Sequence, residues 1–594
     1  MGSIFWFILS LVFQSLPPEK WQESLVRAKD EKVVVIASRL PQKTVCIDRD
    51  IEIIEQTELA QLPAPALSDA LRYFLDSQER GYFGVQADLS LRGSTFQQVL
   101  ILVDGIRLND LQTAHHNLNL PLPLEALESI EILHGPGSAL LGADAFGGAV
   151  NFVTKNPERT GASLKTALYD FGTSSFRGQL NFRWNEISSL LSMEKNKSKG
   201  FMEDRDFDLF SSFYKISWQK GQKKLNLILA GGRKEFGAYD FYTPGMGFPS
   251  REKTETGFLT ASYETTVKSA RFRQVFYFRH HYDHFILDRT RPEYYTNETT
   301  NRSYGTEFSL SFNNLVVGGE LSGEYFDSLK AGHHTAGRSS LFAEKRFWFN
   351  KKWQVGTGAR WDYHRLYGSS FSPQLSFVYL LSGQLKLRAS AGYSFRAPSY
   401  TELYYRDPVN QGNPGLKPER CLSAEIGSDL FLNRLASFHL SAFIRAERDL
   451  IDWIKSPEGK WLADNLVRRT VKGAEFRILT HGEKYNLIFW SAFYHKVAED
   501  QNLILKYSYK IPQNLTALTL SFIPLKKTSF NVSCLYKKRF EEKGFFLLDA
   551  RISRKFGSFD VYIEMKNILG ARYEEVPGVA MPGRWAGAGL ELRI

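Results

Sequence analysis

The second part of the chain, from about residue 160 to residue 594, alternates apolar and polar side chains with a period of two. The segment 559–566 shows the pattern, and the segments 385–394, 516–522 and 586–594 repeat it. One face of 559–566 carries Phe559, Val561, Ile563 and Met565, and the other carries Asp560, Tyr562, Glu564 and Lys566. A period of two is that of a β-strand whose two faces meet different surroundings. We therefore expect sheet throughout this part of the chain.

The composition places this sheet in a membrane. Aromatic residues make up 14% of the 594 residues, with 45 Phe and 27 Tyr, while the mean hydropathy is only −0.29. Strands that cross a bilayer need roughly 9–11 residues each and are apolar only at alternate positions. Residues 160–594 suffice for about 22 such strands with their turns, far more than a soluble sandwich needs. The prediction is an all-β transmembrane barrel of about 22 antiparallel strands that crosses the lipid bilayer.

Residues 39–156 have a different texture. "QQVLILVDGIRLND" predicts a strand at 99–103 followed by a turn, and "LEALESIEIL" passes from near-helical spacing into a strand. A barrel of about 22 strands encloses a lumen that is plugged in proteins of this size. We therefore predict an α/β plug domain at 39–156, inside a barrel formed by 160–594.

Two short segments precede the plug. Residues 4–13 are apolar but too few to span a membrane as a helix, so residues 1–16 are predicted to be a signal peptide, although no basic residue precedes the apolar run. Residues 31–38 place Val33, Val34, Val35, Ile36 and Ala37 beside charged residues. β-Branched side chains favour an extended backbone. This segment is therefore a strand whose partner is not evident in the sequence.

Other functional classes find little support. The net charge of +11 is spread along the chain, which favours a solvated surface, or a lumen that attracts anions, over nucleic-acid binding. The three cysteines, Cys46, Cys421 and Cys534, are too far apart for a zinc motif. No nucleophile elbow, HExxH motif or catalytic carboxylate pair is present, so the chain is not expected to be an enzyme.

Four stretches resemble the TonB-dependent outer-membrane receptor family over nearly the whole chain. They are "LRGSTFQQVLILVDGIRLND", "LESIEILHGPGSALLGADAFGGAVNFVTK", "SFRAPSYTELYYRDPVNQGNPGLKPERCLSAEIG" and "IEMKNILGARYEEVPGVAMPGRWAGAGLELRI". The final Ile594 departs from the family, which usually ends on an aromatic residue. The resemblance implies a monomeric receptor in the outer membrane of a Gram-negative-type bacterium, which actively imports a large, scarce ligand.

The resemblance also implies a role for residues 31–38, which correspond to the TonB box. In the family this segment adds as a strand to the energy-coupling protein TonB, and main-chain hydrogen bonds supply the affinity. Pulling on Val33–Ala37 would then rearrange the plug. The alternative is a strand that pairs within the plug. A passive porin, the channel alternative, would need neither plug nor box.

Plug–barrel pairing is the next implication. Arg92 matches a family arginine that pairs with barrel carboxylates, and Glu402, Glu419 and Glu425 are the candidates. His134 stands where the family usually has arginine. A second plug–barrel ion pair is therefore either missing or dependent on pH.

Histidines give the clearest hint of a ligand. Seven of the twelve lie in three groups: His115 and His116; His280, His281 and His284; and His333 and His334. We expect His115 and His116 on an apical plug loop in contact with ligand, and His280, His281, His333 and His334 as candidate metal ligands. Alternatively, neighbouring histidines point to opposite faces of their strands and only line a polar lumen.

The cargo stays open at this stage. The ending "RYEEVPGVAMPGRW" and the aromatic loop 236–252, with Tyr239, Phe241 and Tyr242, look most like the cobalamin-receptor branch of the family. Ferric siderophores are the rival, and Arg396, Tyr404 and Tyr405 suit either cargo. Haem or another metal complex is less favoured. Haem receptors of the family carry a ligand histidine between the motifs that "FRAP" and "NPGL" match here, and this chain has no histidine between them.

No cofactor is required by this interpretation. Some members of the cobalamin-receptor branch bind calcium in extracellular loops. Asp204, Asp206 and Asp208 alternate in "EDRDFDLF" and offer oxygen atoms of the kind that calcium prefers. The alternative is a row of lumen-facing acids on one strand.

Overall fold

The computed structural model describes residues 47–594, apart from 351, 433–435, 483, 499–502 and 508–510. The predicted signal peptide at 1–16 and the predicted TonB box at 31–38, with Val33, Val34, Val35, Ile36 and Ala37, lie outside the described residues. Among the described residues, none of the helices has the length and apolarity needed to cross a membrane.

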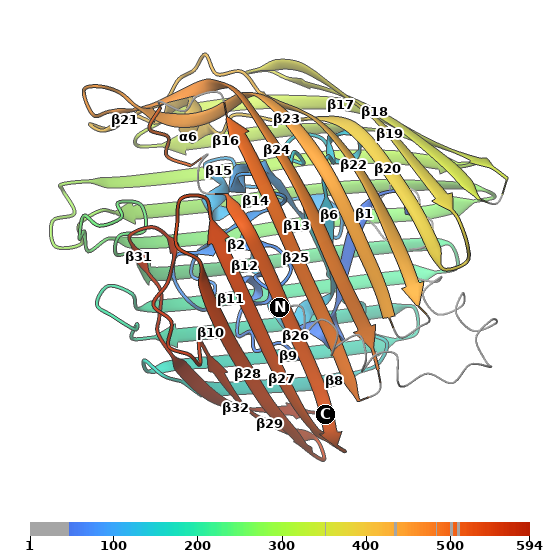
Figure 1. The fold of residues 1–594 in the computed structure, drawn as a ribbon, viewed down its shortest axis with the longest axis horizontal. Helices are drawn as coiled ribbons and strands as arrows, with labels where there is room; N and C mark the ends of the chain where they lie inside the picture. The colour runs from blue at the N-terminus through green and yellow to red at the C-terminus, as the bar shows by residue number, and fades with distance from the viewer. Residues whose placement is uncertain (1–46, 351, 433–435, 483, 499–502, 508–510) are drawn as a thin grey trace.

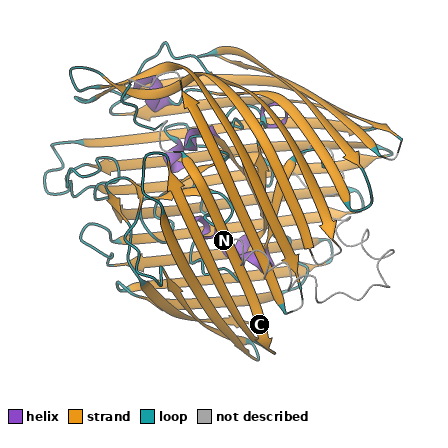
Figure 2. Ribbon diagram, viewed as in Figure 1, coloured by secondary structure: helices purple, strands orange, loops and turns teal. Residues whose placement is uncertain are grey.

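The second part of the chain forms a closed barrel of 22 antiparallel strands (Figures 1 and 2). The barrel strands are β8 (Gly161–Tyr169), β9 (Thr173–Trp184), β10 (Ile187–Ser198), β11 (Phe207–Lys220), β12 (Lys223–Gly237), β13 (Arg251–Val267), β14 (Ala270–Ile286), β15 (Thr296–Phe312), β16 (Leu315–Ser328), β17 (Gly332–Phe349), β18 (Trp353–His364), β19 (Gly368–Leu380), β20 (Leu385–Arg396), β22 (Glu419–Leu432), β23 (Ala436–Lys455), β24 (Trp461–His481), β25 (Tyr485–Ala498), β26 (Pro512–Leu525), β27 (Thr528–Arg539), β28 (Phe545–Phe556), β29 (Phe559–Lys566) and β32 (Trp585–Arg593). Strand β32 pairs with β8 and closes the barrel. This architecture confirms the predicted strand number.

Alternation sorts the side chains between lumen and exterior. In β14, Phe276 and Phe278 are 55% and 42% exposed, whereas Tyr277, Arg279 and His281, at the alternate positions, are buried. Apolar side chains at this level of exposure suit lipid contact, and the buried polar ones face the plug. The outer face is therefore an apolar band and the inner face a polar one.

The connections at the two barrel ends differ in length. Residues 238–250, 287–295 and 397–418 form long loops, whereas 185–186 and 268–269 are tight turns. The long loops gather at the left of Figure 1. The loop 397–418 contains α6 (Tyr400–Tyr404) and β21 (Asn410–Gln411), and a further long connection, 567–584, contains β30 (Glu574–Val576) and β31 (Val579–Ala580). Barrels of the bacterial outer membrane have long extracellular loops and short periplasmic turns. The long-loop end is therefore the extracellular end.

The plug fills the lumen with a five-stranded sheet in the order β1-β6-β7-β4-β5. Its elements are β1 (Asp50–Glu55), α3 (Gln56–Leu59), α4 (Leu67–Leu71), β2 (Asp76–Glu79), β3 (Ala87–Ser90), β4 (Val99–Val103), β5 (Ile106–Arg107), β6 (Leu127–His134), α5 (Ser138–Leu141) and β7 (Gly148–Thr154), with 3-10 helices η2 (Phe96–Gln98), η3 (Ala114–His116) and η4 (Leu124–Ala126). Val99–Val103 is buried at every position, as expected for a central strand with both faces covered. Plug residues such as Ile101 and Phe152 share one apolar core with barrel residues such as Phe213 and Trp490. The plug therefore packs directly against the barrel wall.

Candidate functional site

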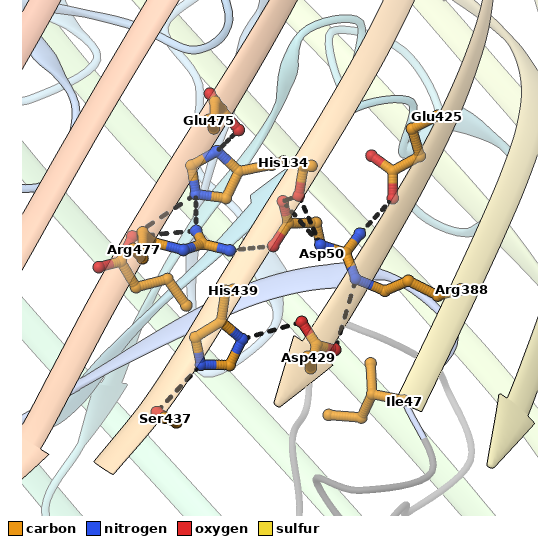
Figure 3. A network of polar contacts seen from close by, with 12 residues as sticks. Ile47, Asp50, His134, Arg388, Glu425, Asp429, Ser437, His439, Glu475 and Arg477 are labelled. Carbon is orange, nitrogen blue, oxygen red and sulfur yellow. Dashed lines mark hydrogen bonds and ion pairs between the residues drawn. The ribbon is translucent and has the colours of Figure 1, made fainter. Parts of the chain in front are cut away.

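A buried network of ion pairs surrounds Asp50, the first residue of β1 (Figure 3). Its carboxylate lies 2.7 Å from Nη2 of Arg92 and 3.2 Å from Nη2 of Arg388, and it also pairs with Arg477. Ser441 Oγ donates a further hydrogen bond at 2.6 Å. Burial alone would raise the pKa of Asp50, but the three guanidinium groups more than offset it and hold the pKa well below its usual range. Asp50 is therefore an anion that joins the plug to strands β20, β23 and β24.

Arg92 completes the link from the plug side. Its Nε donates to Glu475 at 2.9 Å, and its Nη1 donates to Glu425. Of the three carboxylates that the sequence offered as partners, Glu425 contacts Arg92. The structure corrects the other two, because Glu402 and Glu419 both bind Arg396 instead. The partner Glu475 was missed, since only the register of β24 against the plug places it beside Arg92.

The pairing of Glu402 has a local cause. Ser399 is the N-cap of α6, and Glu402 is the third residue of that helix, so its side chain folds back to the Ser399 backbone N–H at 2.8 Å. In this position the Glu402 carboxylate lies 2.9 Å from Nη1 of Arg396. Arg396 is 1% exposed and its guanidinium is taken up by the carboxylates of Glu402 and Glu419, so its role in ligand contact stays a prediction. Through these two ion pairs, Arg396 connects the loop that follows β20 with strand β22.

His134 lies on β6 beside the same network. Its Nδ1 is 3.6 Å from Glu475, and its Nε2 is 3.6 Å from Glu52 and 3.0 Å from Nη1 of Arg477. Figure 3 shows the ring between Glu475 and Arg477. His134 therefore lies at a plug–barrel contact, at the position where the sequence predicts an ion pair that is either missing or dependent on pH.

The apical loop of the plug carries η3, which Thr113 caps through its hydroxyl. His115 stacks on Phe96 with ring centroids 4.3 Å apart, and its Nδ1 lies 2.9 Å from the Asp88 carboxylate. Burial lowers the pKa of His115 to about 4, although the Asp88 charge opposes the shift. The ring is therefore neutral at physiological pH.

The loop between β12 and β13 supplies aromatic side chains next to His115. The Tyr242 ring centroid lies 5.9 Å from the His115 ring, and its hydroxyl donates to Glu252 at 2.6 Å. Phe241 is buried, and the Arg205 guanidinium lies 4.6 Å from its ring centroid. Tyr239 and Tyr242 are half-buried. These two tyrosines therefore keep surface available, whereas Phe241 serves packing.

His116 points away from His115, toward the barrel wall. Its Nε2 is 3.7 Å from Asp283 and its Nδ1 is 3.9 Å from Glu252, and its ring centroid is 4.8 Å from that of His281. Burial opposes its protonation, but the nearby carboxylates, Asp283 first, outweigh burial and raise the pKa of His116 to about 9. Sequence reasoning missed Glu252 and Asp283, because only the strand register brings them to His116.

The remaining histidines do not form one cluster. His280 lies on the outward face of β14, opposite to His281. His333 is exposed, 5.1 Å from the Tyr325 ring. His334 stacks on Tyr404 at 3.7 Å and hydrogen-bonds to the Ala331 carbonyl. The predicted metal set of His280, His281, His333 and His334 is therefore divided, and only His281 approaches His116.

The other predicted contact residues pair with residues of neighbouring loops and strands. The Tyr405 hydroxyl pairs with that of Tyr295 and donates to Asp407 at 3.0 Å. The acidic residues proposed as calcium ligands each have a basic partner: Asp204 pairs with Arg289, Asp206 with Arg251 and Asp208 with Lys195. A calcium ion in the extracellular loops stays a prediction.

The sequence matches two family models and is similar to several known transporters. A family model described as "TonB dependent receptor-like, beta-barrel" matches residues 141–573, and one described as "TonB-dependent Receptor Plug Domain" matches residues 47–149. The vitamin B12 transporter BtuB of Photobacterium profundum is 23% identical over 545 residues, which are 86% of each chain. The BtuB of Vibrio vulnificus (strain YJ016) is 23% identical and matches 76% of each chain.

Solved structures resemble the fold. The siderophore receptor PirA from Acinetobacter baumannii has a TM-score of 0.76 at 16% identity, covering 93% of this chain and 99% of that one. PirA from Pseudomonas aeruginosa has a TM-score of 0.74 at 18% identity, covering 92% and 99%. At these identities the likeness concerns the plugged barrel alone.

Proposed function

Since this chain belongs to the TonB-dependent receptor family, we propose that the ligand it imports is cobalamin. Members of the family lie in the outer membrane of Gram-negative bacteria and import ligands with the help of TonB. The outer-membrane location and TonB-dependent import therefore apply to this chain as a member of the family. The proposal concerns the identity of the cargo.

The observation that carries the proposal is the extent of the match to the vitamin B12 transporters. It covers 86% of this chain and 86% of the relative, so plug and barrel are both included. The family likeness alone would fit any cargo, because it rests on the plug fold and the strand pattern.

The side chains at the extracellular end support this cargo. Tyr242 is half-buried beside the His115–Phe96 stack, and Tyr239, in the same loop as Tyr242, is half-buried as well. Flat aromatic and imidazole rings suit a large ring system with little net charge, because they offer apolar area at a low cost in conformational entropy. His115 adds no positive charge at neutral pH, since burial keeps it neutral.

Ferric siderophores are the second candidate. The net charge of +11 and the histidine groups favour them, because their chelates are usually anionic. The siderophore receptors among the solved structures support this cargo only weakly, since their identities are 18% or less. Haem has less support, because residues 399–412, between "FRAP" and "NPGL", contain no histidine. A passive porin is disfavoured by a plug that is ion-paired to the wall.

Fluorescence titration of the purified, detergent-solubilised receptor would test the proposal. We expect cyanocobalamin to quench the tryptophans saturably at nanomolar concentration, while a ferric siderophore panel and haemin have no effect. Tyr242→Ala should weaken cobalamin binding about tenfold, because a ring contact is lost. Tyr242→Phe keeps the ring and serves as the matched control. If cyanocobalamin causes no quenching and an iron chelate binds saturably, the cargo is a siderophore and the proposal is wrong.

A further inference from the structure

We propose that His116, Glu252 and Asp283 bind one divalent transition-metal ion of the zinc class where the plug meets the barrel wall. The three residues come from η3, from the extracellular end of β13 and from the corresponding end of β14. One donor atom of each lies within 4.8 Å of the other two, and all three residues are buried. The proposal is independent of the cargo, because it concerns a resident ion.

The two carboxylates lack the cationic partners that other buried acids of this protein have. Within the described residues, His116 is the only basic side chain within 4.0 Å of Glu252 or Asp283. By contrast, Asp76 is held by both Lys537 and Arg539. Two buried anions beside one imidazole leave negative charge that a divalent cation would neutralise.

An unpartnered oxygen points to the same place. Gln112 Nε2 donates to Asp283 Oδ2 at 2.8 Å, but the buried Oδ1 of Asp283 accepts no hydrogen bond from any described residue. Asp283 is only 3% exposed. A buried carboxylate oxygen without a donor is costly, so it is a natural metal ligand.

A second imidazole stands beside the first. The ring centroid of His281 is 4.8 Å from that of His116, and Thr256 Oγ1 lies 2.7 Å from His281 Nδ1. The buried Nε2 of His281 has no hydrogen-bond partner in the described part of the chain; its nearest carboxylate oxygen belongs to Asp110, at 3.8 Å. If Nδ1–H donates to the Thr256 hydroxyl, the Nε2 lone pair is left for a metal. His281 is therefore the nearest further donor.

The donor set selects the class of ion. Imidazole together with carboxylate suits zinc and its neighbours, whereas calcium and magnesium prefer oxygen alone. Zinc binds such atoms at about 2.1 Å, and in its tetrahedral geometry two ligand atoms lie about 3.4 Å apart. The three donor atoms here lie within 4.8 Å of one another, so side-chain shifts of about an ångström would close the site.

Each ligand is already oriented by a neighbour. Asn119 lies 3.1 Å from Nδ1 of His116, Tyr242 donates to the second oxygen of Glu252, and Gln112 donates to Asp283. Supporting contacts of this kind fix the ring and carboxylate orientations that metal binding needs. Gln112, His116 and Asn119 belong to the apical plug loop, so a bound ion would hold that loop to β13 and β14.

Calorimetric titration of the metal-stripped receptor with Zn²⁺ tests the proposal. We expect one equivalent to bind, and the affinity to fall at least tenfold in His116→Asn, Glu252→Gln and Asp283→Asn. His280→Asn is the matched control, because it lies on the same strand as Asp283 but on the outward face. A His333→Asn/His334→Asn variant controls for binding at the other histidine pair. Full retention of Zn²⁺ in the His116→Asn variant, or its loss only in the His333/His334 variant, would overturn the proposal.

A second measurement avoids substitutions. X-ray absorption of the zinc-loaded wild-type receptor should show nitrogen and oxygen neighbours at about 2.0–2.2 Å. Sulfur neighbours, or a wild-type receptor that binds no stoichiometric Zn²⁺, would each refute the site. Neither result depends on cobalamin, so failure of the metal site and failure of the cargo proposal are separable.

Discussion

The carboxylate of Asp50 meets the guanidinium of Arg92 at 2.7 Å inside the barrel, and each of the two also contacts the wall. Asp50 begins β1, the first strand of the plug among the described residues. A force applied to the predicted TonB box would therefore reach this strand before the other plug strands that the structure describes. The network is buried and ties the plug to the wall, so we expect it to act as a lock that energy coupling has to break, together with Asp48, which contacts Arg346 and Ser376 of the wall.

Replacing Asp50 by Asn should loosen the plug. The change leaves Arg92, Arg388 and Arg477 without one shared anion, and removing one partner of a buried ion pair costs about 3–5 kcal/mol. Hydrogen exchange followed by mass spectrometry should show faster exchange at the β1 amides, with the barrel strands unchanged.

Asp208→Asn is the control for this experiment, because Asp208 pairs with Lys195 at the surface and both side chains are more than 40% exposed. Exposed pairs contribute about 0–1 kcal/mol, so exchange should match the wild type. Equal exchange of β1 in the Asp50→Asn variant and the wild type would refute the lock.

The predicted TonB box can be tested with Val35→Pro. Proline removes a backbone N–H and fixes φ, so pairing with the edge of a partner sheet should fail. We expect binding of the ligand to purified receptor to persist, while energised uptake by cells that contain TonB is lost. Val35→Thr keeps a β-branched side chain and the N–H, and should retain uptake. Unchanged uptake together with a lower melting temperature would instead favour a strand that pairs within the plug.

The sequence predicted secondary structure correctly where the surroundings of a single residue determine whether its side chain is apolar or polar. The alternation in 559–566 predicted a strand and its two faces, because lipid and a polar lumen impose opposite preferences: Val561 and Ile563 are exposed, whereas Tyr562 and Glu564 are buried. The plug–barrel contacts were harder. Glu425 and Glu402 are equally acidic, and only the stagger of neighbouring strands sets which of them faces Arg92.

The metal-ligand prediction failed for a related reason. It grouped histidines that are adjacent in sequence, but adjacent residues of a strand point to opposite faces, so His280 and His281 separate. The acids that do approach His116 lie on two strands and carry no local signature. Convergence across strands depends on register, which a single sequence does not contain.

Acid should weaken the contact between Asp76 of the plug and the wall. Arg539 contacts both Asp76 oxygens, at 2.9 and 3.0 Å, and Lys537 lies 3.0 Å away. Burial opposes ionisation, but these two cations lower the pKa of Asp76 to about 2 from 3.8. A depressed carboxyl pKa contributes stability above the unfolded value and loses it as the pH falls through the folded value. The contribution, about 2 kcal/mol, should therefore disappear between about pH 4 and pH 2.

Urea unfolding of the plug in wild type and Asp76→Asn, measured from about pH 6 down to pH 2, would reveal this loss. The variant lacks the titrating group, so the difference in unfolding free energy between the two proteins should shrink on acidification. Other depressed carboxylates, such as Asp88, affect both proteins alike and cancel. A difference that stays constant over the whole range would contradict the assignment of the shift to Asp76.

Closure of the barrel depends on a glycine opposite a tyrosine. Gly587 of β32 pairs directly with Tyr169 of β8, and a Cβ at position 587 would lie 1.8 Å from the Tyr169 ring. Gly587→Ala should displace the ring and destabilise the closing strand pair by about 1–3 kcal/mol. Gly231→Ala is the matched control, because a Cβ there meets nothing within 4 Å. The temperature at which the folded band converts to the unfolded band on SDS gels should fall for Gly587→Ala alone, and an equal fall in both variants would mean that strand flexibility, rather than the Tyr169 contact, sets the stability of closure.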